Sequence, residues 1–103
     1  MTTNTEAIDR ITKSVAYRIE QIATARARLQ VAIESHADGL IDDVDLDIIY
    51  DLTTQRADEH ARMAYDAISG IGDPALRNRL TAAVNNEVRN VTHPTRTRRN
   101  HHG

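Results

Sequence analysis

The sequence predicts an all-α fold: an elongated antiparallel helical hairpin followed by a shorter third helix, assembled as a homodimeric helical bundle. Apolar residues recur every three or four positions through the first third of the chain, which is the spacing of one helix face. The 103 residues contain no Phe, Trp or Cys and only three Tyr. The core must therefore come from Ile, Leu, Val and Ala on helix faces, and such faces bury well only against other helices.

The first helix is expected over about residues 5–37, capped by Asn4 or Thr5 and ended by Gly39. Without an internal Gly or Pro it is roughly 45–50 Å long, whereas a compact domain of this size has a radius of gyration of about 13 Å. We therefore expect its apolar stripe to find cover against a second copy of the chain. The residues expected in self-association are Ile8, Ile11, Val15, Ile19, Ile22 and Leu29.

A second helix is expected over about residues 43–69, with Asp42 as its N-cap and Asp45 in its first turn. The connection from the first helix is only a few residues long, which forces the two helices into an antiparallel pair. Its apolar positions are less regular than those of the first helix. Those expected to face the core are Val44, Ile48, Ile49, Leu52, Met63, Ala64, Ala67 and Ile68.

The third helix is expected over about residues 74–91, where Asp73 is the N-cap and Pro74 the first helical residue. It is about half as long as the first helix, so part of the hairpin stays uncovered. One narrow face carries Leu76, Leu80, Val84, Val88 and Val91. The predicted domain covers residues 1–93, and residues 94–103 are expected to be a disordered basic tail.

The formal net charge of −2 conceals a strong division along the chain. Residues 38–73 contain two basic and ten acidic residues, whereas residues 74–103 contain six basic residues and one acidic residue. The two regions are electrostatically complementary, so the basic tail could fold back on the acidic helix, or each region could bind partners of the opposite charge. The acidic partner-binding residues are Asp43, Asp47, Asp51 and Asp58, and the basic ones, for nucleic acid or protein, are Arg77, Arg79, Arg89, Arg96, Arg98 and Arg99.

Four further polar residues fall on or beside the predicted helix seam: Arg18, Arg26, Arg56 and His60. They could line a pocket for an anionic ligand, or they could form seam ion pairs that fix the register of the helices. We favour ion pairs, because no base or nucleophile accompanies them. Residues with numbers summing to about 80–85 face one another in such a hairpin, which places Arg26 near Gln55, Asp58 and Glu59, and Arg18 near Arg62 and Asp66.

No enzymatic activity, cofactor or metal is expected from the motifs of the chain. There is no Gly-rich phosphate loop and no serine in a Gly-x-Ser-x-Gly setting. His60 lacks a second metal ligand three or four residues away on its helix face. No apolar run reaches the ~18 residues that a membrane span needs, and no secretory signal pattern is present, so a cytoplasmic location is expected.

The functional hypothesis is a non-enzymatic protein-interaction module that occludes the surface of a host protein. The composition, rich in Arg and with Lys13 as the single lysine, is typical of GC-rich genomes and suggests an accessory or inhibitory factor of an actinobacterial phage or plasmid. The alternative is a small nucleic-acid-binding accessory protein. It would use the Arg- and Asn-rich third helix and the basic tail, since both side chains suit phosphate and base contacts.

Overall fold

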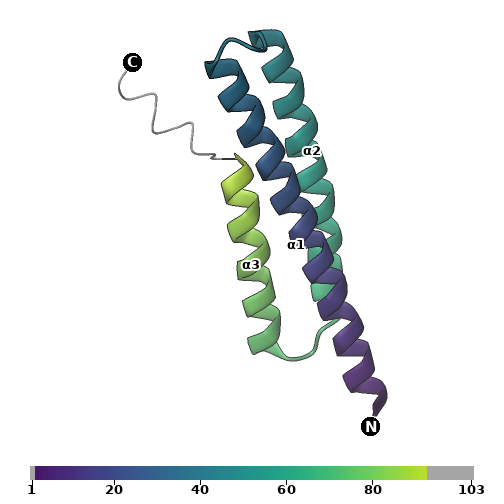
Figure 1. The fold of residues 1–103 in the computed structure, drawn as a ribbon. Coiled ribbons are helices and arrows are strands. Elements are labelled where there is room, and N and C mark those ends of the chain that lie inside the picture. Colours follow the sequence, from purple (N-terminus) through teal and green to yellow (C-terminus); the bar gives the residue numbers. More distant parts are fainter. Residues whose placement is uncertain (1, 93–103) are drawn as a thin grey trace.

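The computed structural model describes residues 2–92 of the chain. It contains three helices, α1 (Thr2–Ala37), α2 (Asp43–Ile68) and α3 (Pro74–Thr92), with no strand among these residues (Figure 1). The all-helical prediction is confirmed. Five of the six helix ends lie within one residue of the expected position. The exception is the start of α1 at Thr2, so Asn4 and Thr5 lie inside the helix and the prediction that one of them caps it is wrong.

The molecule is a rod. α2 runs back alongside α1, and α3 runs beside them over the part of the rod that is farther from the α1–α2 connection (Figure 1). The principal extents are 58 × 23 × 14 Å. A helix of 36 residues, the length of α1, spans about 54 Å at 1.5 Å per residue. The length of the rod is therefore the length of α1.

The helix connections follow the local sequence signals. Gly39 has a φ of +79°, the left-handed conformation that commonly ends a helix. Asp42 caps α2, because its Oδ1 accepts a hydrogen bond of 2.8 Å from the backbone N–H of Asp45. Asp73 Oδ1 accepts one of 3.1 Å from the N–H of Ala75 at the start of α3. The caps expected at Asp42 and Asp73 are confirmed.

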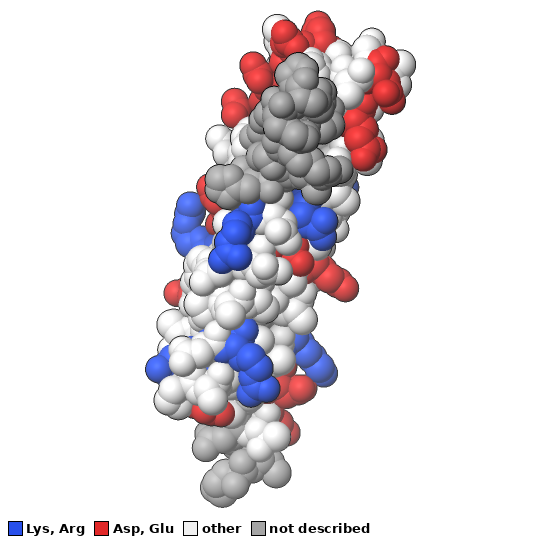
Figure 2. Space-filling view, turned by 90° about the vertical axis from the view of Figure 1, so that its left-hand side faces the viewer, with Lys and Arg blue, Asp and Glu red and all other residues white. Residues whose placement is uncertain are grey.

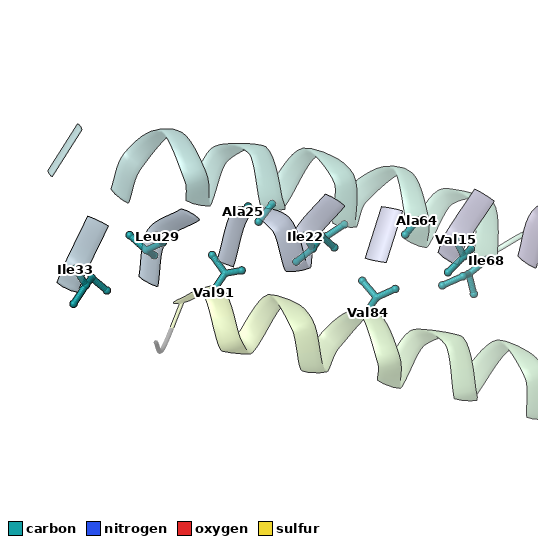
Figure 3. Packing of buried hydrophobic residues seen from close by; sticks show 11 residues of the cluster. Val15, Ile22, Ala25, Leu29, Ile33, Ala64, Ile68, Val84 and Val91 are labelled. Carbon is teal, nitrogen blue, oxygen red and sulfur yellow. The ribbon is translucent and has the colours of Figure 1, made fainter. Parts of the chain in front are cut away.

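The core is a single apolar cluster shared by the three helices. α1 supplies three of the largest fully buried side chains, Val15, Ile22 and Leu29. α2 meets them with small residues, which allow close approach of the two helix backbones. Figure 3 shows Val84 and Val91 pointing from α3 toward α1. The buried alanines of α2 are Ala57, Ala61 and Ala64.

This packing corrects the expected self-association surface. Val15, Ile22 and Leu29 lie inside a single chain, and Ile11 and Ile19 are partly buried against the same cluster. The prediction that these residues face a second copy is wrong, because α2 and α3 already cover this face of α1. Ile8, near the start of α1, is the one residue of the expected set that remains exposed, at 37%.

The expected inner face of α2 is also wrong in part. Val44, Ile48, Leu52 and Met63 are exposed. The positions toward the core are instead occupied by Leu46, Tyr50, Thr53 and the alanines that follow. α2 thus carries more apolar residues than one buried face can hold. None of the helices within residues 2–92 has the length and hydropathy needed to cross a membrane.

Candidate protein-interaction surface on α2

The most unusual surface feature is a row of exposed apolar side chains on the first half of α2. Val44, Ile48 and Leu52 are 64%, 51% and 59% exposed, respectively. Their spacing of four residues places them on successive turns of the same side of the helix. We call these three residues the apolar stripe. Contiguous exposed apolar surface of this kind commonly marks a binding site.

One side of the apolar stripe is acidic. Asp43, Asp47 and Asp51 each directly precede a stripe residue, so they lie about 100° around the helix from it. Asp58 follows Asp51 by seven residues, on the same side, and lines a groove with Tyr65 and Val88 between α2 and α3. These four aspartates are the acidic edge. Figure 2 shows acidic side chains gathered at the end of the rod that holds the α1–α2 connection.

The acidic edge has few partners within the chain. Asp43 Oδ1 contacts His36 Nε2 at 2.5 Å. Among the described residues, no ion pair involves Asp47, Asp51 or Asp58. All four carboxylates are exposed. The charges of Asp47, Asp51 and Asp58 are therefore available to a partner.

The other side of the apolar stripe carries two arginines. Arg28 of α1 and Arg56 of α2 line a groove with Leu52, together with Ala25, Ile49 and Thr53. Both arginines are exposed, and neither forms an ion pair with a described residue. We call Arg28 and Arg56 the arginine edge. The apolar stripe thus separates an acidic edge from an arginine edge.

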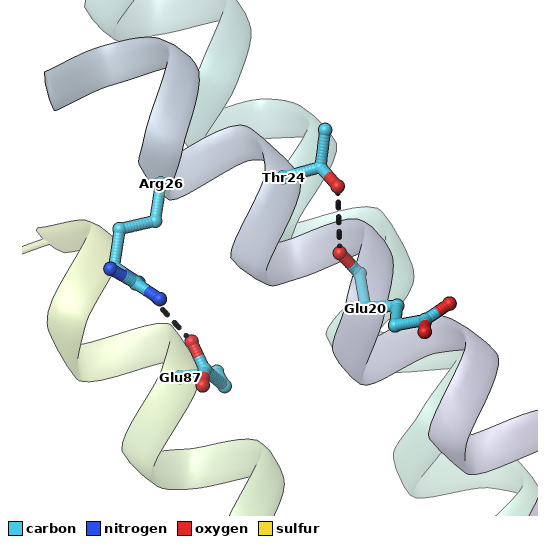
Figure 4. Close-up of polar contacts among 4 residues, drawn as sticks. All are labelled: Glu20, Thr24, Arg26 and Glu87. Carbon is cyan, nitrogen blue, oxygen red and sulfur yellow. Dashed lines mark hydrogen bonds and ion pairs between the residues drawn. The ribbon is translucent and has the colours of Figure 1, made fainter. Parts of the chain in front are cut away.

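Arg26 forms an ion pair, but with a different helix from the one expected. Its Nε lies 3.3 Å from Oε1 of Glu87 on α3, rather than beside residues of α2 (Figure 4). The same view shows Thr24 Oγ1 donating a 2.9 Å hydrogen bond to the backbone carbonyl of Glu20 within α1. Arg26 therefore joins α1 to α3. Its ion pair is with Glu87 and not with the neighbours expected on α2, which were Gln55, Asp58 and Glu59.

Arg18 and His60 form the second polar contact of the seam. Nη1 of Arg18 is 3.0 Å from Nδ1 of His60 on α2. This partner differs from the neighbours expected from the sequence, Arg62 and Asp66. Tyr17 completes the cluster: its ring meets the His60 ring edge-on at 6.3 Å between centroids, and the Arg18 guanidinium lies 5.2 Å from its centroid. Burial lowers the pKa of His60, and the charges of Arg18 and Arg56 lower it further.

The basic residues of α3 are divided in their roles. Nη1 of Arg77 donates a 2.9 Å hydrogen bond to the carbonyl of Ile71, which ties it to the connection before α3. Arg79 and Arg89 are exposed. Asn85 accepts a hydrogen bond from the Tyr65 hydroxyl. The remaining residues of the predicted basic surface, Arg96, Arg98 and Arg99, lie outside the described part of the chain.

The apolar stripe and the arginine edge were not predicted as a site. A signal for the stripe exists in the sequence, since an aspartate followed by an aliphatic residue recurs every four positions at Asp43-Val44, Asp47-Ile48 and Asp51-Leu52. No cluster of three or more potential metal ligands occurs within residues 2–92. The chain matches no protein-family model, and no match was found among curated proteins or solved structures.

Proposed function

We propose that this chain is a non-enzymatic protein–protein interaction module that binds through the apolar stripe and its charged edges. The observation that carries the proposal is the exposure of Val44, Ile48 and Leu52 on three successive turns of α2. An amphipathic helix recognised by a partner typically presents such anchors at helical spacing. Apolar anchors supply affinity, and a charged rim supplies selectivity and faster association.

The proposed mode of action is occlusion. The apolar stripe covers three successive turns of α2, so a partner bound along it would have the apolar surface that it uses for this contact covered. The acidic edge favours a partner with basic residues around an apolar depression. Such a mode requires no reacting group on this chain.

A photo-crosslinking residue in place of Ile48 tests the proposal. Irradiation in the source cell should give a discrete adduct with one polypeptide, and the adduct should disappear when Leu52→Asp is added. The matched control carries the same residue at Ala83, an exposed position of α3. If the adducts at the two positions are the same and Leu52→Asp changes neither, the apolar stripe is not a binding surface.

Nucleic-acid binding through α3 is the alternative proposal, and the exposure of Arg79 and Arg89 favours it. Binding through phosphates would weaken steeply as salt is added, because bound counterions are released. Two variants separate the possibilities: deletion of residues 95–103, and Arg79→Ala with Arg89→Ala. Loss of DNA or RNA affinity in both, with an unchanged adduct at Ile48, would assign a second function to α3.

A further inference from the structure

We propose that the occupant of the apolar stripe is a second copy of this chain, with the two α2 helices side by side and parallel about a two-fold axis. This inference rests on the proposed function, because it names the partner of the same surface. It differs from the self-association expected from the sequence, which placed the contact on α1. Three observations carry it: the exposed stripe, the two charged edges that flank it, and the symmetry that relates them.

The charges on the two edges of the apolar stripe favour a second copy as the partner. Arg28 and Arg56 on one side of the stripe form no ion pair among the described residues, and the same is true of Asp47 and Asp51 on the other side. Within one chain these edges cannot meet, because the stripe lies between them. A second copy presents both edges again, so that the surface is complementary to itself.

The same charges determine the relative orientation of the two copies. In an isologous dimer the same patch is used by both copies. If the two helices run parallel, the two-fold axis brings the acidic edge of each copy against the arginine edge of the other. If they run antiparallel, like edges meet, and Asp51 comes close to the aspartates of the second copy. Opposed like charges disfavour association, so the charge pattern selects the parallel arrangement.

The parallel arrangement determines which residues of the two copies meet. About a parallel two-fold axis each stripe residue faces its own counterpart, so Val44, Ile48 and Leu52 each pack against the same residue of the second copy. Arg56 then lies beside Asp51 of that copy, and Arg28 lies on the same side. The contact covers only about three turns, which predicts a concentration-dependent dimer of the weak interface class.

Single cysteines test the orientation cleanly, since the chain has no native cysteine. Val44→Cys and Leu52→Cys should each form a covalent dimer under mild oxidation or with a short bismaleimide. The control, Ala83→Cys on α3, should not. In an antiparallel pair at most one stripe position can face itself. Cross-linking of only one of the two variants would therefore overturn the parallel arrangement.

A charge exchange tests the edges. We expect Arg56→Asp, and separately Asp51→Arg, to weaken dimerisation roughly tenfold in sedimentation equilibrium, because symmetry removes two ion pairs at once. The two substitutions combined in one chain should restore the dimer. Both sites are exposed, so the melting temperature of dilute protein should change little. Absence of restoration in a folded double variant would overturn the proposed pairing of edges.

The two proposals can fail separately. A chain that sediments as one copy at every concentration, and whose stripe cysteines do not cross-link, has no second copy on its stripe. If the Ile48 adduct with another polypeptide persists in that case, the proposed function stands and only its occupant is different. If both the dimer and the adduct are absent, both proposals are wrong.

Discussion

Nη1 of Arg18 lies 3.0 Å from Nδ1 of His60, and this contact defines the protonation state of the histidine. A guanidinium has only N–H donors, so Nδ1 must be the acceptor. While this hydrogen bond is made, His60 is neutral and carries its proton on Nε2. Protonation of Nδ1 would replace a hydrogen bond by a repulsion between two cations, which agrees in direction with the lowered pKa of His60.

We therefore expect the chain to lose stability in mild acid. In the unfolded chain His60 titrates near 6.5, whereas in the folded chain its pKa is lower. As the pH falls below 6.5, the unfolded state takes up a proton that the folded state does not. The stabilisation of the folded state by neutral His60 is complete above pH 6.5. It is lost as the pH falls from 6.5 to the pKa of His60 in the folded chain, and a further fall in pH changes it no more.

Urea unfolding at a series of pH values measures this effect. His60→Gln is the matched variant, since its amide oxygen can accept the hydrogen bond from Arg18 but does not titrate. The fall in the free energy of unfolding below pH 6.5 should be smaller in His60→Gln than in the native chain. An identical pH profile in both proteins would show that other groups cause the acid sensitivity.

A pair of leucines tests the assignment of interior and surface. Leu29 is fully buried, whereas Leu52 is 59% exposed. Leu29→Ala should cost about 2–5 kcal/mol of unfolding free energy, because it removes apolar burial and leaves a cavity. Leu52→Ala should change stability by no more than about 0.5 kcal/mol in dilute protein. Similar losses of unfolding free energy for both variants in chemical denaturation would contradict the observation that Leu52 lies on the face of α2 that points away from the core.

The sequence predicted the helices well because their signals are local. The apolar face of α1 has no Gly or Pro to interrupt it. The caps at Asp42 and Asp73 depend only on residues two or three positions away. Gly39 ends the α1 segment through its own φ angle. Each of these features could be inferred without knowing where the other helices lie.

The surfaces could not be predicted in the same way, because they depend on how three helices share one core. Either of two apolar faces of α2 could have been the buried one, and the choice of the face with Ala57 and Ala61 left Ile48 outside. Arg26 likewise points to α3, which the pairing of α1 with α2 alone does not reveal. The charge of the acidic edge was predictable, but its position beside an exposed apolar stripe was not.

The Arg26–Glu87 pair should contribute measurably to the docking of α3. Its side chains are 42% and 21% exposed, so solvent screens the interaction in part. A double-mutant cycle with Arg26→Met and Glu87→Gln should give a coupling free energy of about 0.2–1 kcal/mol, as for other partly exposed ion pairs. The coupling should shrink in high salt. A coupling indistinguishable from zero at low salt would show that apolar contacts alone hold α3 in this region.

Two glycines provide the last test, which concerns the connection that sets α2 beside α1. Gly39 and Gly72 both have open space where a Cβ would be added, so neither substitution by alanine creates a steric clash. They differ in backbone conformation, since only Gly39 among the described glycines has a positive φ, of +79°. An L-residue in that region costs about 1–2 kcal/mol. Gly39→Ala should therefore lower the free energy of unfolding by about that amount, whereas Gly72→Ala should be neutral or stabilise by up to about 1 kcal/mol through the unfolded state. Equal effects of the two substitutions in thermal or urea unfolding would mean that the α1–α2 connection does not hold Gly39 in the left-handed conformation.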